Sequence, residues 1–218
     1  MRDDGNVNSK EYWDTRFNTG DWENSGGSNQ TQSFAKSQIP LLDIPSGFSG
    51  SLCDFGCGTG DAFPIYRQAY PYANLIGVDF SQGAIDKCNT MYSSLGDFFV
   101  ADEHSTPSSD IILASNVFEH ISDDESVLEV LLSKCQRLYV IVPFEEQPLI
   151  SEHVRSYNLD SYKRFSPKRK VKFKTRGWSV YGRSLMWEVY AKNIWRQIAG
   201  LEKKKQKYQI LYEFDGTR

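Results

Sequence analysis

Long apolar segments are missing from this sequence. No run approaches the roughly 20 consecutive apolar residues that a membrane-spanning helix requires. The first residues, Met1–Gly5, also lack the apolar stretch of a secretory signal. We therefore expect a soluble, cytoplasmic protein, with peripheral contact to the inner face of the membrane as an open alternative.

Cysteine is scarce, and its spacing excludes the usual metal and redox motifs. The chain has four cysteines, and no two of them form a Cys-x-x-Cys pair. We expect all four to be buried thiols. No cluster of Asp, Asn or His shows convincing ligand spacing either, so the sequence predicts no metal site.

Internal repeats and low-complexity segments are absent as well. At 218 residues the chain is long enough for one α/β domain with a real core, and too short for two domains of ordinary size. We expect a single domain over residues 1–218. It would consist of a helical N-terminal segment (1–45), a central core (50–145) and further elements with C-terminal strands (146–218).

Charge is divided unevenly along the chain, although the net charge is only −3. Residues 1–150 carry 22 acidic and 8 basic side chains, a net charge of −14. Residues 151–218 carry 6 acidic and 17 basic side chains, a net charge of +11. The basic last third is thus a candidate for contact with an anionic partner such as nucleic acid, a phosphorylated glycan or a membrane surface.

Strands and helices alternate along the middle of the sequence. Apolar runs such as Leu138–Val142 are typical of strands buried on both faces. This alternation predicts an α/β fold with a doubly wound, mostly parallel sheet and helices on both faces. Strands are expected at residues 51–55, 74–79, 97–101, 111–115 and 137–143, and helices at residues 62–69, 82–91 and 125–133.

The two ends of the chain follow other patterns. The polar N-terminal segment carries aromatic side chains that a disordered tail would lack. There we expect helices at residues 10–17 and 31–42 and a loop through Gly26 and Gly27. Towards the C-terminus, apolar residues alternating with lysines predict an amphipathic, antiparallel strand. That strand is expected at residues 168–180, with helices at 158–164 and 185–199 and a last strand at 208–214.

The most informative stretch is Leu52–Gly60, where a short apolar strand leads into three glycines. Their Gly-x-Gly-x-Gly spacing differs from the Gly-x-Gly-x-x-Gly of dinucleotide-binding domains. Asp54 precedes the loop and Asp61 follows it, where a helix N-terminus would otherwise receive a pyrophosphate. Because two carboxylates repel a diphosphate and attract an ammonium or sulfonium, the sequence favours a cationic nucleoside as cofactor.

Three motifs make the sequence resemble the class I S-adenosylmethionine-dependent methyltransferases. Asp54–Gly60 resembles the family's first motif, Gly77–Ser81 its acidic motif after the second strand, and Ser115–Ile121 the segment after its fourth strand. The specific match covers residues 50–145. The resemblance implies a seven-stranded, Rossmann-like sheet with an antiparallel C-terminal edge, S-adenosyl-L-methionine as cofactor, and methyl transfer as the activity.

The resemblance also implies which residues hold the cofactor. The glycine loop, Asp54, Gly56, Cys57, Gly58 and Gly60, would let the backbone approach the methionine part. Asp79 would accept the two ribose hydroxyls, unless it only caps the following helix. Phe80 would pack on the adenine, and Asp102 or Glu103 would receive the adenine amino group, unless these are solvated loop charges.

Two further contacts with the cofactor follow from the resemblance. Asn116, after the fourth strand, would touch the methionine part. In the N-terminal segment, Tyr12, Trp13 and Arg16 would fold over the cofactor, with the guanidinium holding its carboxylate. The alternative for these three residues is an ordinary surface helix.

Histidines are the candidate general bases, because a hydroxyl acceptor gains from one in methyl transfer. His120 is expected at the carboxyl end of the sheet, where α/β proteins bind ligands. His153 resembles a histidine that faces the acceptor in many small-molecule members of the family. A structural role is the alternative for both. Glu119 and Glu145 are further candidates, and His104, in a polar loop, is the least favoured.

The acceptor is expected to be a small molecule or a glycan, methylated at oxygen. Residues 21–35 resemble methyltransferases of bacterial surface-glycan synthesis, and Trp13, Trp22 and Trp178 could serve as platforms for a sugar.

Two alternatives stay open. The first is an RNA or DNA methyltransferase that uses the eight basic residues in Lys163–Arg176, although lysines on an edge strand also prevent aggregation and the Asn/Asp-Pro-Pro-Tyr/Phe motif is absent. The second is a catalytically silent module that binds a partner through its basic last third.

Overall fold

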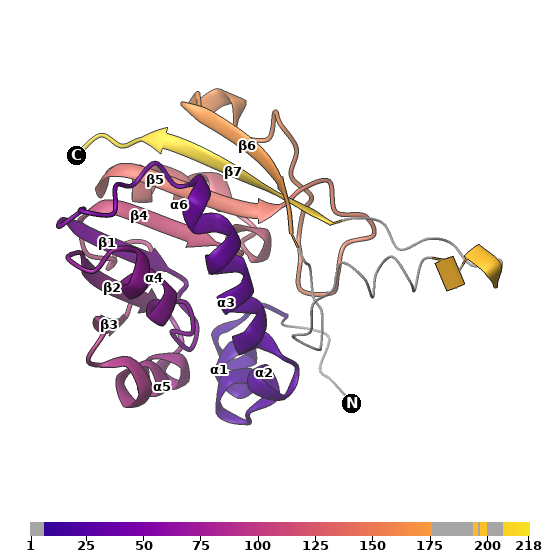
Figure 1. Cartoon of the computed structure of the whole chain (residues 1–218), viewed down its shortest axis with the longest axis horizontal. Helices are drawn as coiled ribbons and strands as arrows, with labels where there is room; N and C mark the ends of the chain where they lie inside the picture. The colour runs from indigo at the N-terminus through magenta and orange to yellow at the C-terminus, as the bar shows by residue number, and fades with distance from the viewer. Residues whose placement is uncertain (1–6, 176–193, 196, 200–206) are drawn as a thin grey trace.

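A seven-stranded sheet forms the centre of the computed structural model, which describes residues 7–175, 194–195, 197–199 and 207–218 (Figure 1). The strand order is β3-β2-β1-β4-β5-β7-β6. Strands β1 to β5 pair in parallel, whereas β7 is antiparallel to both β5 and β6. The bounds are β1 Ser51–Phe55, β2 Asn74–Asp79, β3 Asp97–Val100, β4 Ser109–Ser115, β5 Cys135–Pro143, β6 Arg169–Lys174 and β7 Tyr208–Asp215.

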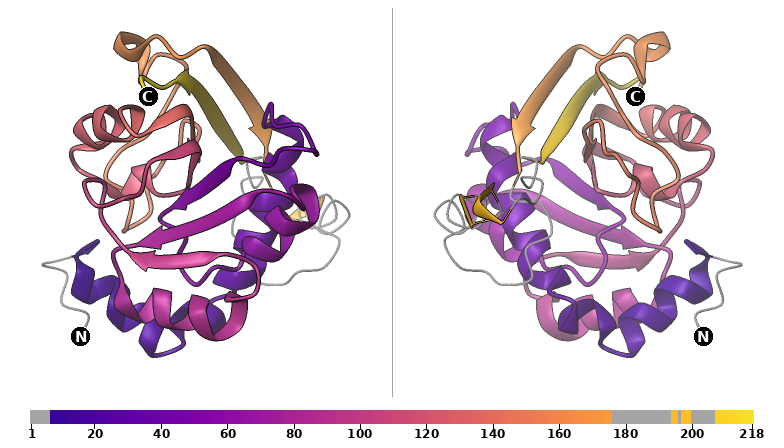
Figure 2. Two further views of the ribbon diagram at one scale, coloured as in Figure 1. Left: turned by 90° about the vertical axis from the view of Figure 1, so that its left-hand side faces the viewer. Right: turned by 90° about the vertical axis from the view of Figure 1, so that its right-hand side faces the viewer.

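The apolar runs of the sequence form the middle of this sheet. Tyr139–Val142 of β5 and Ile112–Ala114 of β4 are almost completely buried, as expected for strands covered on both faces. Figure 2 shows β3 at one edge of the sheet and β6 and β7 at the other. The strand order reverses between β1 and β4, which opens a crevice at the carboxyl ends of these two strands.

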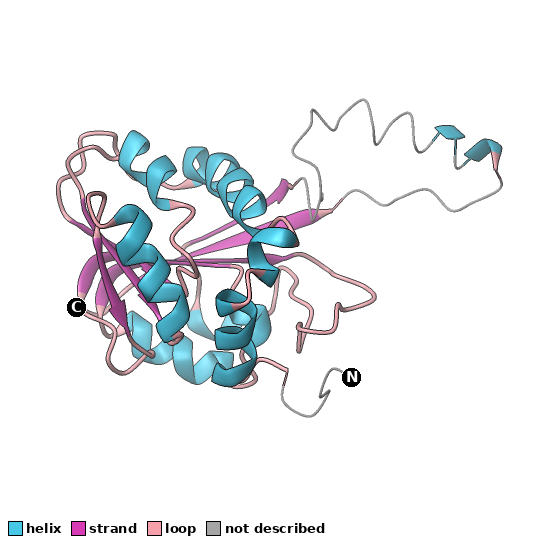
Figure 3. Ribbon diagram, turned by 90° about the horizontal axis from the view of Figure 1, so that it is seen from below, coloured by secondary structure: helices cyan, strands magenta, loops and turns pink. Residues whose placement is uncertain are grey.

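Helices cover both sides of the strands (Figure 3). Ala35, Phe63 and Ile85, from α3, α4 and α5, share an apolar cluster with one face of the sheet. Leu128 of α6 packs on the opposite face. The helix bounds are α1 Lys10–Asn18, α2 Asp21–Asn24, α3 Gly27–Gln38, α4 Phe63–Ala69, α5 Gln82–Tyr92 and α6 Asp124–Leu132, with 3-10 turns η1 Ile39–Leu41, η2 Phe118–His120 and η3 Lys163–Phe165.

The predicted fold class is confirmed, including the antiparallel C-terminal edge. Each of the first five strands begins and ends within two residues of its predicted bounds. The four cysteines are buried free thiols, as predicted. None of the helices in the described part is long and apolar enough to cross a membrane.

The predicted loop through Gly26 and Gly27 was wrong, because two helices meet there. Gly26 takes a left-handed conformation, with φ of 82°, immediately before α3 begins at Gly27. A Cβ atom on Gly27 would lie 2.3 Å from the Trp22 ring. These glycines therefore allow a sharp turn and a close helix contact, rather than marking an open loop.

The helix predicted at residues 158–164 was also wrong. This segment forms turns that end in η3. The hydroxyls of Tyr157 and Tyr162 both donate to Asp124 Oδ2, at 2.9 and 2.6 Å, and Asp124 is fully buried. Because these two tyrosines are five residues apart and both bond to one carboxylate, they hold the backbone between them in a non-helical conformation.

The amphipathic antiparallel strand is present as β6, which ends at Lys174. Val171 and Phe173 pack against the apolar core, while Lys170, Lys172 and Lys174 are exposed. The remainder of the predicted strand, to residue 180, and most of the predicted helix at 185–199 lie outside the described residues.

Candidate functional site

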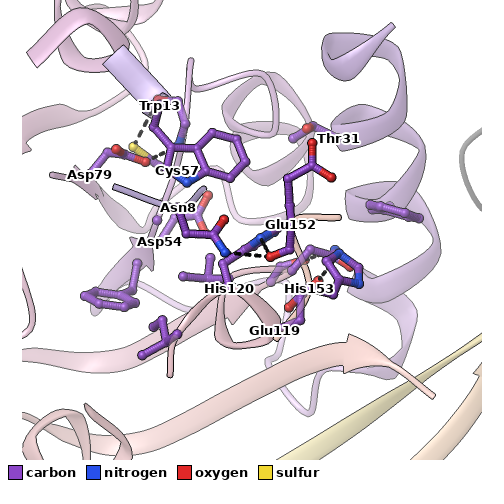
Figure 4. A pocket seen from close by; sticks show the side chains of 18 of the residues that line it. Asn8, Trp13, Thr31, Asp54, Cys57, Asp79, Glu119, His120, Glu152 and His153 are labelled. Carbon is purple, nitrogen blue, oxygen red and sulfur yellow. Dashed lines mark hydrogen bonds and ion pairs between the residues drawn. The ribbon is translucent and has the colours of Figure 1, made fainter. Parts of the chain in front are cut away.

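A cavity of about 850 Å³ lies at the carboxyl ends of the parallel strands. Its lining comes from the loops after β1, β2, β4 and β5 and from the N-terminal helices. Figure 4 shows Asp54 and Asp79 on one side of it and Glu119, His120 and His153 on another. The crevice predicted from the strand order is therefore a pocket in which both groups of candidate residues meet.

The glycine loop after β1 forms one wall of the cavity. Gly56, Gly58 and Gly60 all have positive φ, at 74°, 53° and 77°. A Cβ atom on Gly56 would lie 2.4 Å from a methyl of Val117. The amides of Gly56 and Cys57 both donate to Val78 O, at 2.8 and 2.9 Å, which folds the loop back onto β2. The glycines are needed here because this turn requires left-handed backbone in close contact with its neighbours.

Asp79 ends β2 and is only 7% exposed. Its Oδ2 accepts from the Gly58 amide and its Oδ1 from the Ser81 amide, both at 2.9 Å. The cap of α5 is Ser81, whose hydroxyl accepts from the Ala84 amide at 3.2 Å. Asp79 therefore joins the glycine loop to the turn before the helix while its carboxylate lines the cavity.

Burial raises the pKa of Asp79 to about 6, although the two amide hydrogen bonds act in the opposite direction. The pKa of Asp54 changes more. Burial and the nearby Asp79 raise this pKa to about 8, although a hydrogen bond with Tyr66 acts to lower it. Both carboxyl groups line the cavity. Two buried carboxyl groups close together are costly to ionise, and a cationic ligand beside them lowers the free-energy cost of their negative charge.

Asp61 does not line the cavity with Asp54, contrary to the expectation for the two carboxylates. It is 4% exposed and accepts hydrogen bonds from the Thr59 and Tyr92 hydroxyls, at 2.6 and 3.2 Å. Its role is to hold the glycine loop against α5. The electrostatic preference for a cation therefore comes from Asp54 and Asp79.

The residues expected near an adenine lie at the rim of the cavity. Phe80, Asp102 and Glu103 all line it, and the Phe80 side chain is partly exposed. The Asp102 carboxylate, however, turns into its own loop, where it accepts from the amide and hydroxyl of Ser105, at 2.8 and 2.6 Å. These hydrogen bonds lower the pKa of Asp102. Of the two acidic candidates, Glu103 keeps the freer carboxylate.

Asn116 follows β4 with φ of 57° and lines the cavity. Its Oδ1 accepts from Gln209 Nε2 at 2.6 Å, and its Nδ2 donates to Ser115 Oγ at 3.0 Å. Gln38 completes the network, because it accepts from Ser115 Oγ at 2.9 Å and donates to Gln209 at 3.2 Å. Sequence reasoning missed Gln38 and Gln209, which come from distant elements and carry no local motif.

Helix α1 lies against the cavity through Glu152. Arg16 Nη1 pairs with Glu152 Oε1 at 2.9 Å, and the Tyr12 hydroxyl donates to the same oxygen at 2.8 Å. Trp13 and Arg16 line the cavity, whereas Tyr12 does not. Burial acts to raise the pKa of Glu152, but hydrogen bonds from Tyr12 and Ser151 outweigh it, and the pKa is about 2. Helix α1, which carries the three predicted residues, is thus tethered through Tyr12 and Arg16 by a carboxylate that the sequence analysis did not identify.

Glu119, His120 and His153 form a cluster at another part of the cavity wall (Figure 4). One ligand atom of each lies within 4.8 Å of the other two. His153 Nε2 is 4.0 Å from Glu119 Oε1, and the two imidazole centroids are 5.0 Å apart. The structure thus brings both predicted histidines together with Glu119. We refer to these three residues as the acceptor-side cluster.

Neighbouring groups determine which nitrogen of each imidazole is free. His120 Nδ1 lies 3.0 Å from Glu152 O and must donate to it, because a carbonyl oxygen only accepts. His153 Nδ1 contacts the Glu146 carboxylate. Burial and the neighbouring His153 lower the pKa of His120 to about 4, and burial raises the pKa of Glu119 to about 8.

Two other acceptor-side candidates take no part in the cavity. Glu145 is exposed, and its neighbour Glu146 is the residue that faces His153. His104 is exposed in its loop near Glu103. The sequence analysis did not find the acceptor-side cluster, because His153 is distant in the sequence from Glu119 and His120 and only the fold brings the three side chains together. The available signal was an acidic residue beside a histidine after β4, with a second histidine after β5.

Comparisons with known proteins agree with this geometry. Residues 53–137 match a family model described as a methyltransferase domain. A chain from the complex between the Haloferax volcanii Trm112 methyltransferase activator and a methyltransferase superposes with a TM-score of 0.68 at 14% identity, over 94% of this chain and 98% of that one.

Two further solved structures share the fold. One is a coclaurine N-methyltransferase bound to N-methylheliamine and S-adenosylhomocysteine, with a TM-score of 0.58 at 12% identity, over 85% of this chain and 72% of that one. The other is an O-methyltransferase from a Brevibacillus brevis trans-AT polyketide synthase, with a TM-score of 0.56 at 12% identity, over 84% and 72%. Residues 53–137 thus match a methyltransferase domain, and the described chain shares the fold of these solved methyltransferase structures.

Proposed function

We propose that this protein is an S-adenosylmethionine-dependent methyltransferase that methylates a hydroxyl group on a small molecule or a sugar. The observation that carries this proposal is the acceptor-side cluster, which lies in the same cavity as Asp54, Asp79 and the glycine loop. Ionisable groups that face a methyl donor are suited to a hydroxyl acceptor, because a hydroxyl reacts faster when it loses its proton.

The cavity fits S-adenosylmethionine at the positions that the sequence singled out. Asp79 offers the ribose hydroxyls a buried carboxylate that is held in place by two amides. At Gly58 an added Cβ would have, among the described residues, only the Phe17 ring within 4 Å, so the backbone stays open to the methionine part. Asp54 and Asp79 favour the positive charge that the cofactor carries. When bound, the cofactor supplies a methyl group on a sulfonium.

His153 is the side chain that we propose as the general base. Its Nδ1 faces the Glu146 carboxylate, which leaves Nε2 as the basic nitrogen on the side of Glu119. A carboxylate that orients an imidazole and stabilises its protonated form is a recurrent arrangement in enzymes. Trp13 packs edge-on against His120, with 5.2 Å between ring centroids, and so helps to exclude water from this end of the cavity.

A small acceptor fits the described structure better than a nucleic acid does. The basic strand β6 has internal contacts: Lys170 donates to Leu159 O at 2.7 Å, and Lys172 lies 4.0 Å from the Phe144 ring centroid. Lys168 pairs with Asp215 at 3.1 Å. Helix α1 forms part of the cavity wall, through Trp13 and Arg16.

The test combines cofactor binding with acceptor identification. Asp79→Ala should weaken binding of S-adenosylhomocysteine by at least about 100-fold in calorimetry, because it removes a charged acceptor for two hydroxyls. Asp79→Asn should cause most of the same loss while preserving shape. The matched control is Asp86→Ala, an exposed residue on α5 that should bind as the wild type does.

Methyl-labelled cofactor and fractionated cell extract then identify the acceptor. Label should enter small metabolites or glycans, and mass spectrometry with NMR should place it on oxygen. Label in RNA, or methyl on nitrogen, would contradict the proposed acceptor. Normal cofactor affinity in Asp79→Ala would show that the proposed binding residues are misassigned.

A further inference from the structure

The acceptor-side cluster has the composition of a metal site. It offers one carboxylate and two imidazoles, with ligand atoms within 4.8 Å of one another. A carboxylate and two histidines around a divalent cation, with the remaining positions open, are a recurrent arrangement in zinc hydrolases and non-haem iron enzymes. Glu119 and His120 are adjacent in η2, and His153 reaches them from the segment after β5.

Glu119 gives an independent indication that this cluster binds a ligand. Its side chain is only 1% exposed, and Oε2 has no hydrogen-bond partner among the residues that the structure describes. A buried carboxylate oxygen without a partner is costly, and such groups in native proteins are normally paired or bound to a cation. This oxygen belongs to the same residue that faces His153 across 4.0 Å.

The second ring nitrogens of the histidines are already held as metal-bound histidines require. Histidines that bind metal almost always direct the other nitrogen to a carbonyl or carboxylate, which fixes the tautomer and the ring. His120 Nδ1 donates to Glu152 O, and His153 Nδ1 faces Glu146. Both arrangements leave Nε2 as the nitrogen with a free lone pair.

We propose that Glu119, His120 and His153 bind one divalent first-row transition metal ion such as Zn²⁺ or Mn²⁺. The two imidazole ligands favour these ions over Mg²⁺ and Ca²⁺, which prefer oxygen. Three protein ligands leave positions for the acceptor hydroxyl, and a bound cation lowers the pKa of a coordinated oxygen. This role rests on the proposed function, and in the metal-bound form His153 is a ligand instead of the base.

Direct binding of the metal alone tests the site. The protein is stripped with a chelator, dialysed, and titrated in separate calorimetric experiments with Zn²⁺, Mn²⁺ and Mg²⁺. We expect one equivalent of Zn²⁺ or Mn²⁺ to bind, and Mg²⁺ to bind at least tenfold more weakly. Glu119→Gln and His153→Asn should each weaken binding of the favoured ion by at least 100-fold. His104→Asn removes an exposed histidine outside the cavity and should leave binding unchanged.

The visible spectrum of a Co²⁺ titration provides a second readout. The d–d bands should change in His120→Asn as well as in the two other variants, whereas His104→Asn should give the wild-type spectrum. Circular dichroism checks that each variant is folded. If Glu119→Gln does not fold, the two histidine variants carry the test.

The outcomes separate this inference from the proposed function. The metal site would be contradicted if the wild-type protein bound none of the ions more tightly than the folded variants do. It would also be contradicted if Mg²⁺ bound as tightly as Mn²⁺. S-adenosylhomocysteine binding to the stripped protein would show that the cofactor site stands without the metal. Metal binding without cofactor binding would instead contradict the proposed function and leave the metal site intact.

Discussion

Buried carboxyl groups give this protein a pH-dependent stability at the level of single residues. In the free protein, burial raises the pKa of Asp54 to about 8 and of Asp79 to about 6, from ordinary values near 3.8. The folded chain therefore holds these protons more tightly than the unfolded chain does. The resulting stabilisation is complete below about pH 3.8 and is lost as the pH rises through 6 and 8.

Asp54→Asn should remove the part of the stability loss at rising pH that comes from Asp54. The cofactor-free variant should be more stable than the wild type at pH 8 by at least about 1.4 kcal/mol, the equivalent of one pKa unit. The difference should shrink towards pH 4, and urea denaturation across that range would measure it. Asp97→Asn, at an exposed position of β3, controls for the substitution itself. A pH-independent difference for Asp54→Asn would contradict the assignment.

The position of a residue at the cavity could be predicted where local sequence determines it. Asp79 ends a strand that the apolar pattern identifies, and Asn116 follows another, so their place at the cavity could be predicted. Arg16 also lines the cavity, but its pairing with Glu152 could not be foreseen, because the two are 136 residues apart in sequence. Long-range partners depend on how the elements pack, which periodicity does not encode.

At the scale of elements, strands were predicted better than the polar helices. The strands carry continuous apolar runs, whereas α2 and α3 are polar and begin after glycines with left-handed backbone. The prediction of a helix at residues 158–164, before β6, failed for the opposite reason. Its sequence suits a helix, but the bonds of Tyr157 and Tyr162 to Asp124 override that local preference.

Helix α1 should depend on Glu152 for its position on the cavity. The Glu152 carboxylate accepts from Tyr12 and Arg16, and its main-chain oxygen accepts from Asn8 at 2.7 Å. Glu152→Gln removes the charge of the ion pair, which should cost about 1 to 3 kcal/mol in local stability. Hydrogen exchange in residues 10–18 should accelerate, while exchange in β4 and β5 stays unchanged.

A matched variant separates this effect from a general loss of charge. Glu23 of α2 also pairs with a cation, since its carboxylate lies 2.6 Å from Lys87, but both side chains are more exposed. Glu23→Gln should change exchange in α1 much less than Glu152→Gln does. Equal effects of the two substitutions would show that Glu152 has no special role in holding the helix.

At the scale of the whole molecule, several basic side chains of the last third form ion pairs with acidic side chains of the same chain. Arg164 pairs with Glu125 and Glu129 of α6, at 3.1 and 3.0 Å. Arg155 contacts the buried Asp124, and Arg16 of the acidic part pairs with Glu152 of the basic part. The charge division seen in the sequence thus serves, among the described residues, to bring the two parts of the chain together.

The C-terminal edge of the sheet provides the strongest case of this pairing. Glu213 of β7 is 2% exposed and lies between arginines of the two neighbouring strands. Its carboxylate is 2.7 Å from Arg169 Nε and 3.7 Å from Arg137 Nε. Arg169 also donates to Leu41 O at 2.7 Å, which ties β6 to the segment after α3.

Glu213→Gln should therefore destabilise the whole fold and not only the edge. Removing one partner of a buried ion pair leaves uncompensated charge, and we expect a loss of about 3 kcal/mol, because both arginines keep partial access to water. Urea denaturation should show a lower midpoint with an unchanged slope. The control is Asp215→Asn, whose pair with Lys168 is exposed and should contribute less than about 0.5 kcal/mol. A loss in Glu213→Gln no larger than in this control would mean that apolar packing of β7 against β5, and not the charge pairing, holds the edge of the sheet.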